Sequence, residues 1–421
     1  MPYRGWAGER VERERADIGG ARMWTEYVRE RRPVVLEGLL VDEAWRGGSW
    51  ADLGELKAKA GDALVKVERL GEGGQFGTGN ARERMRLREL VEKLEGGEEG
   101  YYLTTQYESG EDEEDAEEEW PAVDDVLPAP TDRLAGDFPA QPEVLGELVL
   151  QQCNLWLGRS KEGRTTGLHH DFHDNLYMLL RGEKRFVLFP PSAHEYLHVR
   201  GAVQEVHENG LIVYEEGVRA DGLTEEEAEA WRAAGAAGGA DEAGEGERVA
   251  KRARVEEEEE DDDDESEEES VAPVWGEAGD DDGDDDDEWE GEHNCADDYE
   301  AVEEELAAVE NKEPESFSKI KTSVLHKHFG VGGASGEIEE GELRPLAGCP
   351  APIVVELKAG EMLYLPAGWF HEVTSRGTEG VHMAFNYWMH PPDGKEAAYV
   401  DAAAWKAYRA AVAAAVEAKQ K

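Results

Sequence analysis

The feature of this sequence that most limits its fold is an acidic stretch at residues 256–310. It holds 31 of the 98 Asp and Glu residues of the chain, and it contains no Lys or Arg. Such a stretch cannot bury enough apolar surface to offset the entropy lost on ordering, and its like charges repel one another. We therefore predict a disordered insertion at about 235–310, so that the folded body is assembled from the residues on its two sides.

Both flanks of the insertion contain apolar runs of strand length that are separated by Gly or Pro. The runs are ELVLQQCNLWLG, NLYMLLRGEKRFVLFP, APIVVELKAGEMLYLP, WFHEVTS and VHMAFNYWM. Short strands at this spacing favour an antiparallel barrel or sandwich. A barrel tolerates the insertion, because closure entropy grows only slowly with the length of a loop.

The two ends of the chain differ from this strand-rich centre. Residues 32–40 and 100–107 have the composition of strands, whereas NARERMRLRELVEKLEGG places most of its apolar residues on one helix stripe. The predicted organisation is an N-terminal α/β part at 1–130, a β-rich core at 131–395 that contains the insertion, and an alanine-rich helix at 396–421. The predicted fold class is α+β, mainly β.

Composition argues against several classes of protein. The three cysteines, Cys153, Cys295 and Cys349, are too few and too scattered for a disulfide framework or a zinc module, which favours a reducing compartment. The chain lacks the clustered Lys and Arg that neutralise phosphates, so we expect no direct nucleic-acid binding. We also expect no signal peptide and no association with a membrane, because no apolar run is long enough.

One short basic motif bears on localisation. Lys251, Arg252 and Arg254 in AKRARVE match a minimal nuclear-import pattern, although basic runs of this length also occur by chance. We expect a nuclear and/or cytoplasmic protein.

The densest group of candidate ligand side chains is TTGLHHDFHD, at residues 165–174. Alternate residues of a strand share one face, so His169 and Asp171 point the same way while His170 points to the other side. A third ligand must come from another strand, and His371 in LPAGWFHEV is the best candidate. Two histidines and one carboxylate form the facial triad of non-haem Fe(II) oxygenases. A His-x-Asp pair alone also arises by chance, and a lone strand histidine is more often a packed residue.

Residues 165–191 and 360–388 together resemble the two halves of a Jumonji-C (JmjC) domain, within the cupin-8 group of small oxygenases. The family pattern is matched in order by Thr166, His169, Asp171, Asn175, Lys184, His371, Asn386 and Trp388. The resemblance extends over about 30–200 and 314–392, and it implies a double-stranded β-helix, the jelly-roll barrel of cupins. The long insertion departs from the family pattern and leaves the substrate open.

The resemblance implies a role for each matching residue. His169, Asp171 and His371 would bind Fe(II) as the catalytic centre. Lys184 would pair with the distal carboxylate of 2-oxoglutarate, since a buried ammonium is costly without an anion. The other cosubstrate contacts that it implies are Thr166, Asn175, Asn386 and Tyr177. For Tyr177, packing in the barrel core is an equal alternative.

The activity implied by the resemblance is oxygenation that consumes O2 and 2-oxoglutarate and releases succinate. Hydroxylation of a protein side chain is the preferred reaction, because the chain has no reader motif of the zinc-finger, PHD or Tudor kind. Demethylation of a methyl-lysine or methyl-arginine is the alternative enzyme. A non-catalytic metal-binding cupin scaffold is the alternative outside enzymes, and the intact set of Thr166, Asn175 and Lys184 argues against it.

Two expectations concern partners. The acidic insertion would attract a basic protein substrate such as a histone or ribosomal protein, or it is solvating filler or a tethered inhibitor. The C-terminal helix would form a homodimer, or it would pack on its own barrel.

Several residues near these motifs receive structural interpretations instead. We interpret His170 as structural and His173 as lying just beyond the metal or in solvent. We interpret Trp369, Phe370 and Trp388 as barrel core, and His326 and His328 as surface or packing residues. GEGGQFGTGN at 71–80 lacks the remainder of a phosphate-binding motif, and we interpret it as a flexible loop at the pocket mouth.

Overall fold

The computed structural model describes residues 8–70, 76, 82–106, 123, 125–238, 314–332 and 346–420. Most of the predicted insertion at 235–310, the nuclear-import motif, Cys295 and all of the 71–80 loop except Phe76 lie outside the described residues. The start of the predicted insertion is an exception. Residues 235–238 form the end of helix α5 (Glu225–Gly238), where the prediction of disorder was wrong.

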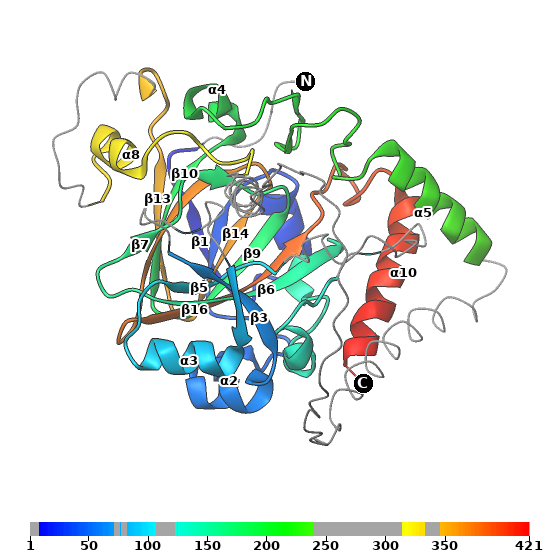
Figure 1. The fold of residues 1–421 in the computed structure, drawn as a ribbon. Helices are drawn as coiled ribbons and strands as arrows, with labels where there is room; N and C mark the ends of the chain where they lie inside the picture. Colours follow the sequence, from blue (N-terminus) through cyan, green and yellow to red (C-terminus); the bar gives the residue numbers. More distant parts are fainter. Residues whose placement is uncertain are drawn as a thin grey trace, which may run out of the picture.

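Within the described residues, nine strands form the larger of two main β-sheets (Figure 1). The strand order is β1-β2-β14-β9-β16-β6-β5-β3-β4, and the pairings are antiparallel except that of β1 with β2. The strands are β1 (Glu12–Arg15), β2 (Val34–Glu37), β3 (Leu64–Arg69), β4 (Arg82–Arg86), β5 (Tyr101–Leu103), β6 (Leu150–Arg159), β9 (Asp174–Arg181), β14 (Glu361–Leu365) and β16 (Val381–Met389).

The smaller sheet of the described chain has the order β13-β10-β15-β7, and β8 also pairs with β15. Its strands are β7 (Arg164–Thr165), β8 (His169–His170), β10 (Glu183–Phe189), β13 (Ile353–Lys358) and β15 (Phe370–Arg376). A separate hairpin consists of β11 (Glu205–Val206) and β12 (Ile212–Val213). Strands from the two sides of the insertion therefore alternate in the smaller sheet and in the central part of the larger one, β2-β14-β9-β16-β6.

Side-chain alternation sorts the apolar residues into three layers. Residues of both sheets, among them Tyr177, Phe186 and Trp369, fill the space between the sheets. The other face of the larger sheet packs against helices, and the other face of the smaller sheet, which includes Phe370, packs against α4 and α8. This mainly-β arrangement confirms the predicted fold class, and Trp369 and Phe370 are core residues as predicted.

The helices lie outside this barrel, and none of those in the described part of the chain is long and apolar enough to cross a membrane. They are α1 (Gly20–Met23), α2 (Leu53–Ala60), α3 (Leu87–Glu95), α4 (His194–Leu197), α5, α8 (Thr322–Phe329) and α10 (Ala402–Lys419). Short 3-10 turns lie at Gly47–Ala51, Asp132–Asp137, Glu143–Leu145 and Pro191–Ala193, and a π-helical turn at Trp24–Val28. Helix α3 starts later than its apolar stripe predicts, because the preceding residues pair with β3 as strand β4.

The predicted C-terminal helix is α10, which lies beside α5 (Figure 1). Trp231 of α5 contacts the ring of Tyr408 at 4.9 Å between centroids, and Arg232 pairs with Asp401 at 2.8 Å. One face of α10 is thus covered by its own chain. A homodimer through this helix stays a prediction.

The N-terminal part is built into the same larger sheet as the core. Strand β2 pairs with β14, and β5 pairs with β6. Arg31 crosses into the core as well, where its guanidinium donates to both carboxylate oxygens of the fully buried Asp174 at 2.8 and 2.5 Å. Asp174 also accepts from the Tyr364 hydroxyl and from the Ala367 backbone. These bonds fix the start of β9 close to the candidate ligands.

Candidate metal centre

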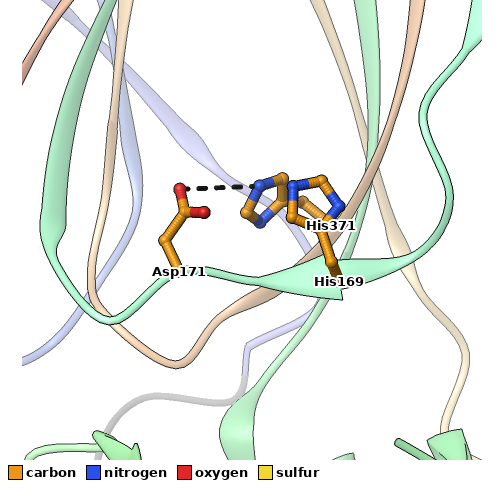
Figure 2. Close-up of side chains that lie close together, drawn as sticks. All are labelled: His169, Asp171 and His371. Carbon is orange, nitrogen blue, oxygen red and sulfur yellow. Dashed lines mark ion pairs between the residues drawn. The ribbon is translucent and has the colours of Figure 1, made fainter. Parts of the chain in front are cut away.

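The three candidate ligands converge from two neighbouring strands. His169 lies on β8, Asp171 follows that strand directly, and His371 lies on β15 directly opposite His169. One ligand atom of each residue lies within 4.8 Å of those of the other two, and His371 Nε2 is 3.7 Å from an Asp171 carboxylate oxygen. Figure 2 shows the three side chains pointing toward one another. The alternation rule thus places His169 and Asp171 on the same side, as predicted.

Backbone carbonyls fix the proton positions of both imidazoles. The Nδ1 atom of His169 is 2.7 Å from the Gly167 carbonyl, and that of His371 is 3.0 Å from the Trp369 carbonyl. Since a carbonyl only accepts hydrogen bonds, each Nδ1 carries the proton and each Nε2 presents a lone pair. Burial, and then the neighbouring His371, lowers the pKa of His169 to about 4. His169 is therefore neutral at physiological pH, the form that binds a metal.

This donor set fits a divalent metal of the Fe(II) type. Two imidazole nitrogens and one carboxylate oxygen are the facial triad, which leaves coordination positions open. A structural zinc site would offer four protein ligands, whereas the described residues offer three here. The arrangement suits an ion that also binds small molecules.

A relay of hydrogen bonds orients the carboxylate of the triad. Trp156 Nε1 donates to Asn386 Oδ1 at 2.8 Å, and Asn386 Nδ2 donates to Asn175 Oδ1 at 3.0 Å. Asn175 Nδ2 then lies 3.4 Å from Asp171 Oδ2 and donates to it. The two asparagines that the family resemblance assigns to the cosubstrate therefore contact each other and support a metal ligand.

Replacing Asn386 by alanine will weaken divalent-metal binding about tenfold, the lower end of the effect of losing an outer partner of a metal ligand. The substitution removes the acceptor of Trp156 and the donor to Asn175, so that the Asp171 carboxylate loses its orientation. Titration with Co(II) under anaerobic conditions measures the change.

The matched control is Asn154→Ala. Asn154 lies on β6 directly opposite Asn386, is equally buried, and makes no side-chain hydrogen bond to the described residues. Its removal will leave the metal affinity unchanged. Equal affinities of wild type and Asn386→Ala would show that the relay does not orient Asp171.

Lys184 lies on β10, inside the barrel and almost completely buried. Its ammonium is 3.3 Å from the Tyr102 hydroxyl and lies 5.6 and 5.7 Å from the ring centres of Tyr102 and Tyr177. Burial lowers the pKa of Lys184 to about 7. No carboxylate pairs with it among the described residues. An anionic ligand would supply the missing charge.

Two further residues, Thr166 and Phe76, lie near Tyr102, the hydrogen-bond partner of Lys184. The Thr166 hydroxyl is buried and has no hydrogen-bond partner among the described residues. Phe76 forms an isolated bridge with Thr166, and its ring contacts Tyr102 at 5.2 Å between centroids. Phe76 therefore connects Thr166 with the partner of Lys184. A buried hydroxyl without a partner among the described residues and a buried ammonium with a neutral partner suit an anionic ligand such as a carboxylate.

The remaining histidines of the motif region lie outside the triad. His170 is buried on the opposite face, with Nε2 at 2.8 Å from the Tyr214 hydroxyl. His173 stacks on Trp388 at 5.6 Å between centroids. His326 was given a surface or packing role, but it has a specific partner: its Nε2 is 3.0 Å from Glu372, the fully buried neighbour of His371.

Three residues of this region were missed by the sequence analysis. Tyr102 contacts Lys184, Trp156 begins the relay, and Phe317 stacks on His169. Of these three, only Trp156 could have been suggested by the sequence, because it lies in the predicted strand CNLWLG. Tyr102 and Phe317 reach the site through tertiary pairings that no local pattern shows.

Comparison of this sequence with known proteins shows the family to which the chain belongs. The model of the cupin-like domain matches residues 20–395. The JmjC domain-containing protein 4 of Schizosaccharomyces pombe is 36% identical over 426 residues, which covers 95% of this chain and 89% of that protein. The human bifunctional peptidase and (3S)-lysyl hydroxylase JMJD7 is 35% identical over 71 residues, 17% of this chain and 22% of that protein. The chain belongs to the cupin-like domain family, in its JmjC group.

Proposed function

We propose that the protein is an Fe(II)- and 2-oxoglutarate-dependent oxygenase that hydroxylates a side chain of another protein. The observation that carries this proposal is the pairing of a three-ligand centre with a buried lysine that lacks a carboxylate partner among the described residues. A metal-binding scaffold has no use for such a lysine, because burying an unpaired ammonium destabilises the fold. A cosubstrate with a distal carboxylate explains it.

Each residue of the site has a distinct task in this proposal. His169, Asp171 and His371 would hold Fe(II), which supplies the activation of O2 that side chains cannot provide. The Gly167 and Trp369 carbonyls and the relay through Asn175 hold these ligands in place. Lys184 and Thr166 would bind the distal carboxylate of 2-oxoglutarate. The apolar layer around them excludes water from the reaction.

Hydroxylation of a protein side chain is favoured over demethylation. The human relative is described as a (3S)-lysyl hydroxylase, so a lysyl side chain is the first candidate substrate. The acidic stretch at 256–310 would attract a basic substrate protein, because it is rich in Asp and Glu and contains no Lys or Arg. We propose a nuclear and/or cytoplasmic site of action on the basis of the basic motif at 251–254.

The test combines two measurements on the purified full chain. The protein is incubated with Fe(II), ascorbate, 2-oxoglutarate and a set of basic peptides that contain lysine. Succinate is measured in solution, and the peptides are analysed by mass spectrometry. We expect succinate formation that depends on Fe(II), and a peptide that has gained one oxygen atom.

Other results have defined meanings. Formaldehyde release from methylated peptides would contradict the proposed hydroxylation and indicate demethylation instead. Failure of the metal-loaded protein to bind 2-oxoglutarate would overturn the enzyme and favour the scaffold. Binding is measured by isothermal titration calorimetry with Co(II) in place of Fe(II).

A further inference from the structure

Residues 316–318, which follow the acidic stretch in the sequence, lie beside the strand that carries His169. Ser318 donates its backbone N–H to the Leu168 carbonyl at 2.8 Å, and Phe317 forms an antiparallel bridge with His169. The His170 N–H points to the Ser316 carbonyl at 3.4 Å. Residues 316–318 therefore pair with β8 along one edge, while β15 pairs with it along the other.

The side chain of Phe317 covers one face of the His169 imidazole. The two rings are nearly parallel, at 7° between planes and 4.6 Å between centroids, and Phe317 is buried. The bond from Nδ1 to the Gly167 carbonyl restrains one atom of the imidazole, but it leaves tilting about that bond open. A flat ring against the face blocks this tilt, so the two contacts together fix the direction of the Nε2 lone pair.

The same segment holds the strand of the second histidine. His326 on α8 contacts Glu372, which is next to His371 on β15 and is fully buried. The hydroxyls of Thr374 and Thr165 also donate to Glu372. Val324 and Leu325 anchor α8 in the apolar layer that includes Phe370. Residues 314–329 thus contact both strands that carry histidine ligands.

We propose that Phe317 is a positioning residue of the metal centre, and that its pairing with β8 completes this centre. The inference rests on the proposed function for the presence of a metal. A positioning role and a packing role for Phe317 predict different experimental results. A packing residue contributes to stability alone, whereas a positioning residue sets the affinity for the ion through the orientation of His169.

The decisive variant is Phe317→Leu, which keeps an apolar side chain in place but removes the flat ring. Its control is Phe329→Leu, at the end of α8 in the same segment, where the ring contacts Phe189 at 5.4 Å and no ligand. Co(II) affinity is measured by anaerobic titration of visible absorption, and thermal unfolding is recorded without metal. Phe317→Ala is a second variant, and Phe317→Leu suffices if the alanine protein does not fold.

We expect Phe317→Leu to weaken Co(II) binding about tenfold, as for other partners of metal ligands. Phe329→Leu will lower the unfolding temperature and leave the affinity unchanged. Equal Co(II) affinities of Phe317→Leu and wild type would overturn the positioning role, while the proposed oxygenase would stand. Absence of Co(II) binding by the wild type would overturn the metal centre itself and with it both proposals.

Discussion

Replacing His371 by alanine will abolish tight Co(II) binding and reduce succinate formation by roughly a thousand-fold or more, since an outer partner alone contributes about 10–100-fold. The reason lies in the pairing of β8 with β15, which places His371 directly opposite His169. Without it, the centre keeps one imidazole and one carboxylate. Anaerobic Co(II) titration and succinate release with Fe(II) measure the two effects.

The control for this experiment is His194→Ala. His194 lies on α4, and its Nδ1 contacts the Pro191 carbonyl rather than any ligand of the triad. Its replacement will leave succinate formation at the wild-type rate. Normal Co(II) affinity in His371→Ala would show that the converging side chains are not the metal centre, because the remaining pair cannot replace a third ligand.

Replacing Lys184 by methionine will stabilise the protein without ligands and weaken 2-oxoglutarate binding at least about a hundred-fold, the effect of losing a charged partner of a buried anion. Methionine has a similar length and no charge to bury. The pKa of Lys184 is lowered by burial to about 7, from an ordinary value above 10. This shift corresponds to a destabilisation of the wild type by about 4 kcal/mol at pH 7, which the variant avoids.

The sign of the pH dependence follows from the same lowered pKa. Between about pH 7 and pH 10 the unfolded chain keeps the Lys184 proton that the folded chain releases, so wild-type stability rises with pH in this window. The advantage of Lys184→Met is therefore largest at pH 7 and below, and it shrinks toward pH 10. Urea unfolding at pH 6.5 and pH 9 measures it.

Cosubstrate binding has the opposite pH dependence. The carboxylate of 2-oxoglutarate pairs with the protonated amine, so binding above pH 7 takes up a proton and its affinity falls as the pH rises. Calorimetry in buffers of different ionisation enthalpy detects this uptake. Lys57→Met, at a half-exposed lysine paired with Glu95, is the control and will alter neither binding nor its pH dependence. A Lys184→Met protein with unchanged 2-oxoglutarate affinity would remove Lys184 from the cosubstrate site.

The sequence was informative about the triad because strand alternation is a local property. His169 and Asp171 share a face through their spacing, and His371 was chosen because it lies on a predicted strand after a Pro-Ala-Gly turn. The register that sets His371 opposite His169 is a property of two strands about 200 residues apart. Alternation in each strand does not determine it.

Other features depended on packing between distant segments. Helix α3 has a regular apolar stripe, yet its first part becomes strand β4 because pairing with β3 is available. Similarly, His326 shows no ligand spacing, and its partner Glu372 becomes apparent only when α8 packs against the smaller sheet. In the first case, strand pairing overrode the local helix propensity. In the second, packing created a contact that no local pattern predicts.

The way in which the N-terminal strands join the larger sheet has a consequence for dissecting the molecule. A fragment that begins at residue 131 would lack β2 and β5, so the edges of β14 and β6 would be exposed. It would also lack Arg31, so the buried carboxylate of Asp174 would have no ion-pair partner. Open edges promote aggregation, and an unpaired buried carboxylate is strongly destabilising. We therefore expect that the barrel does not fold on its own when the chain is cut at this boundary. Substitutions that disrupt β2 or β5, or that remove Arg31, are therefore expected to destabilise the barrel that holds the candidate metal ligands.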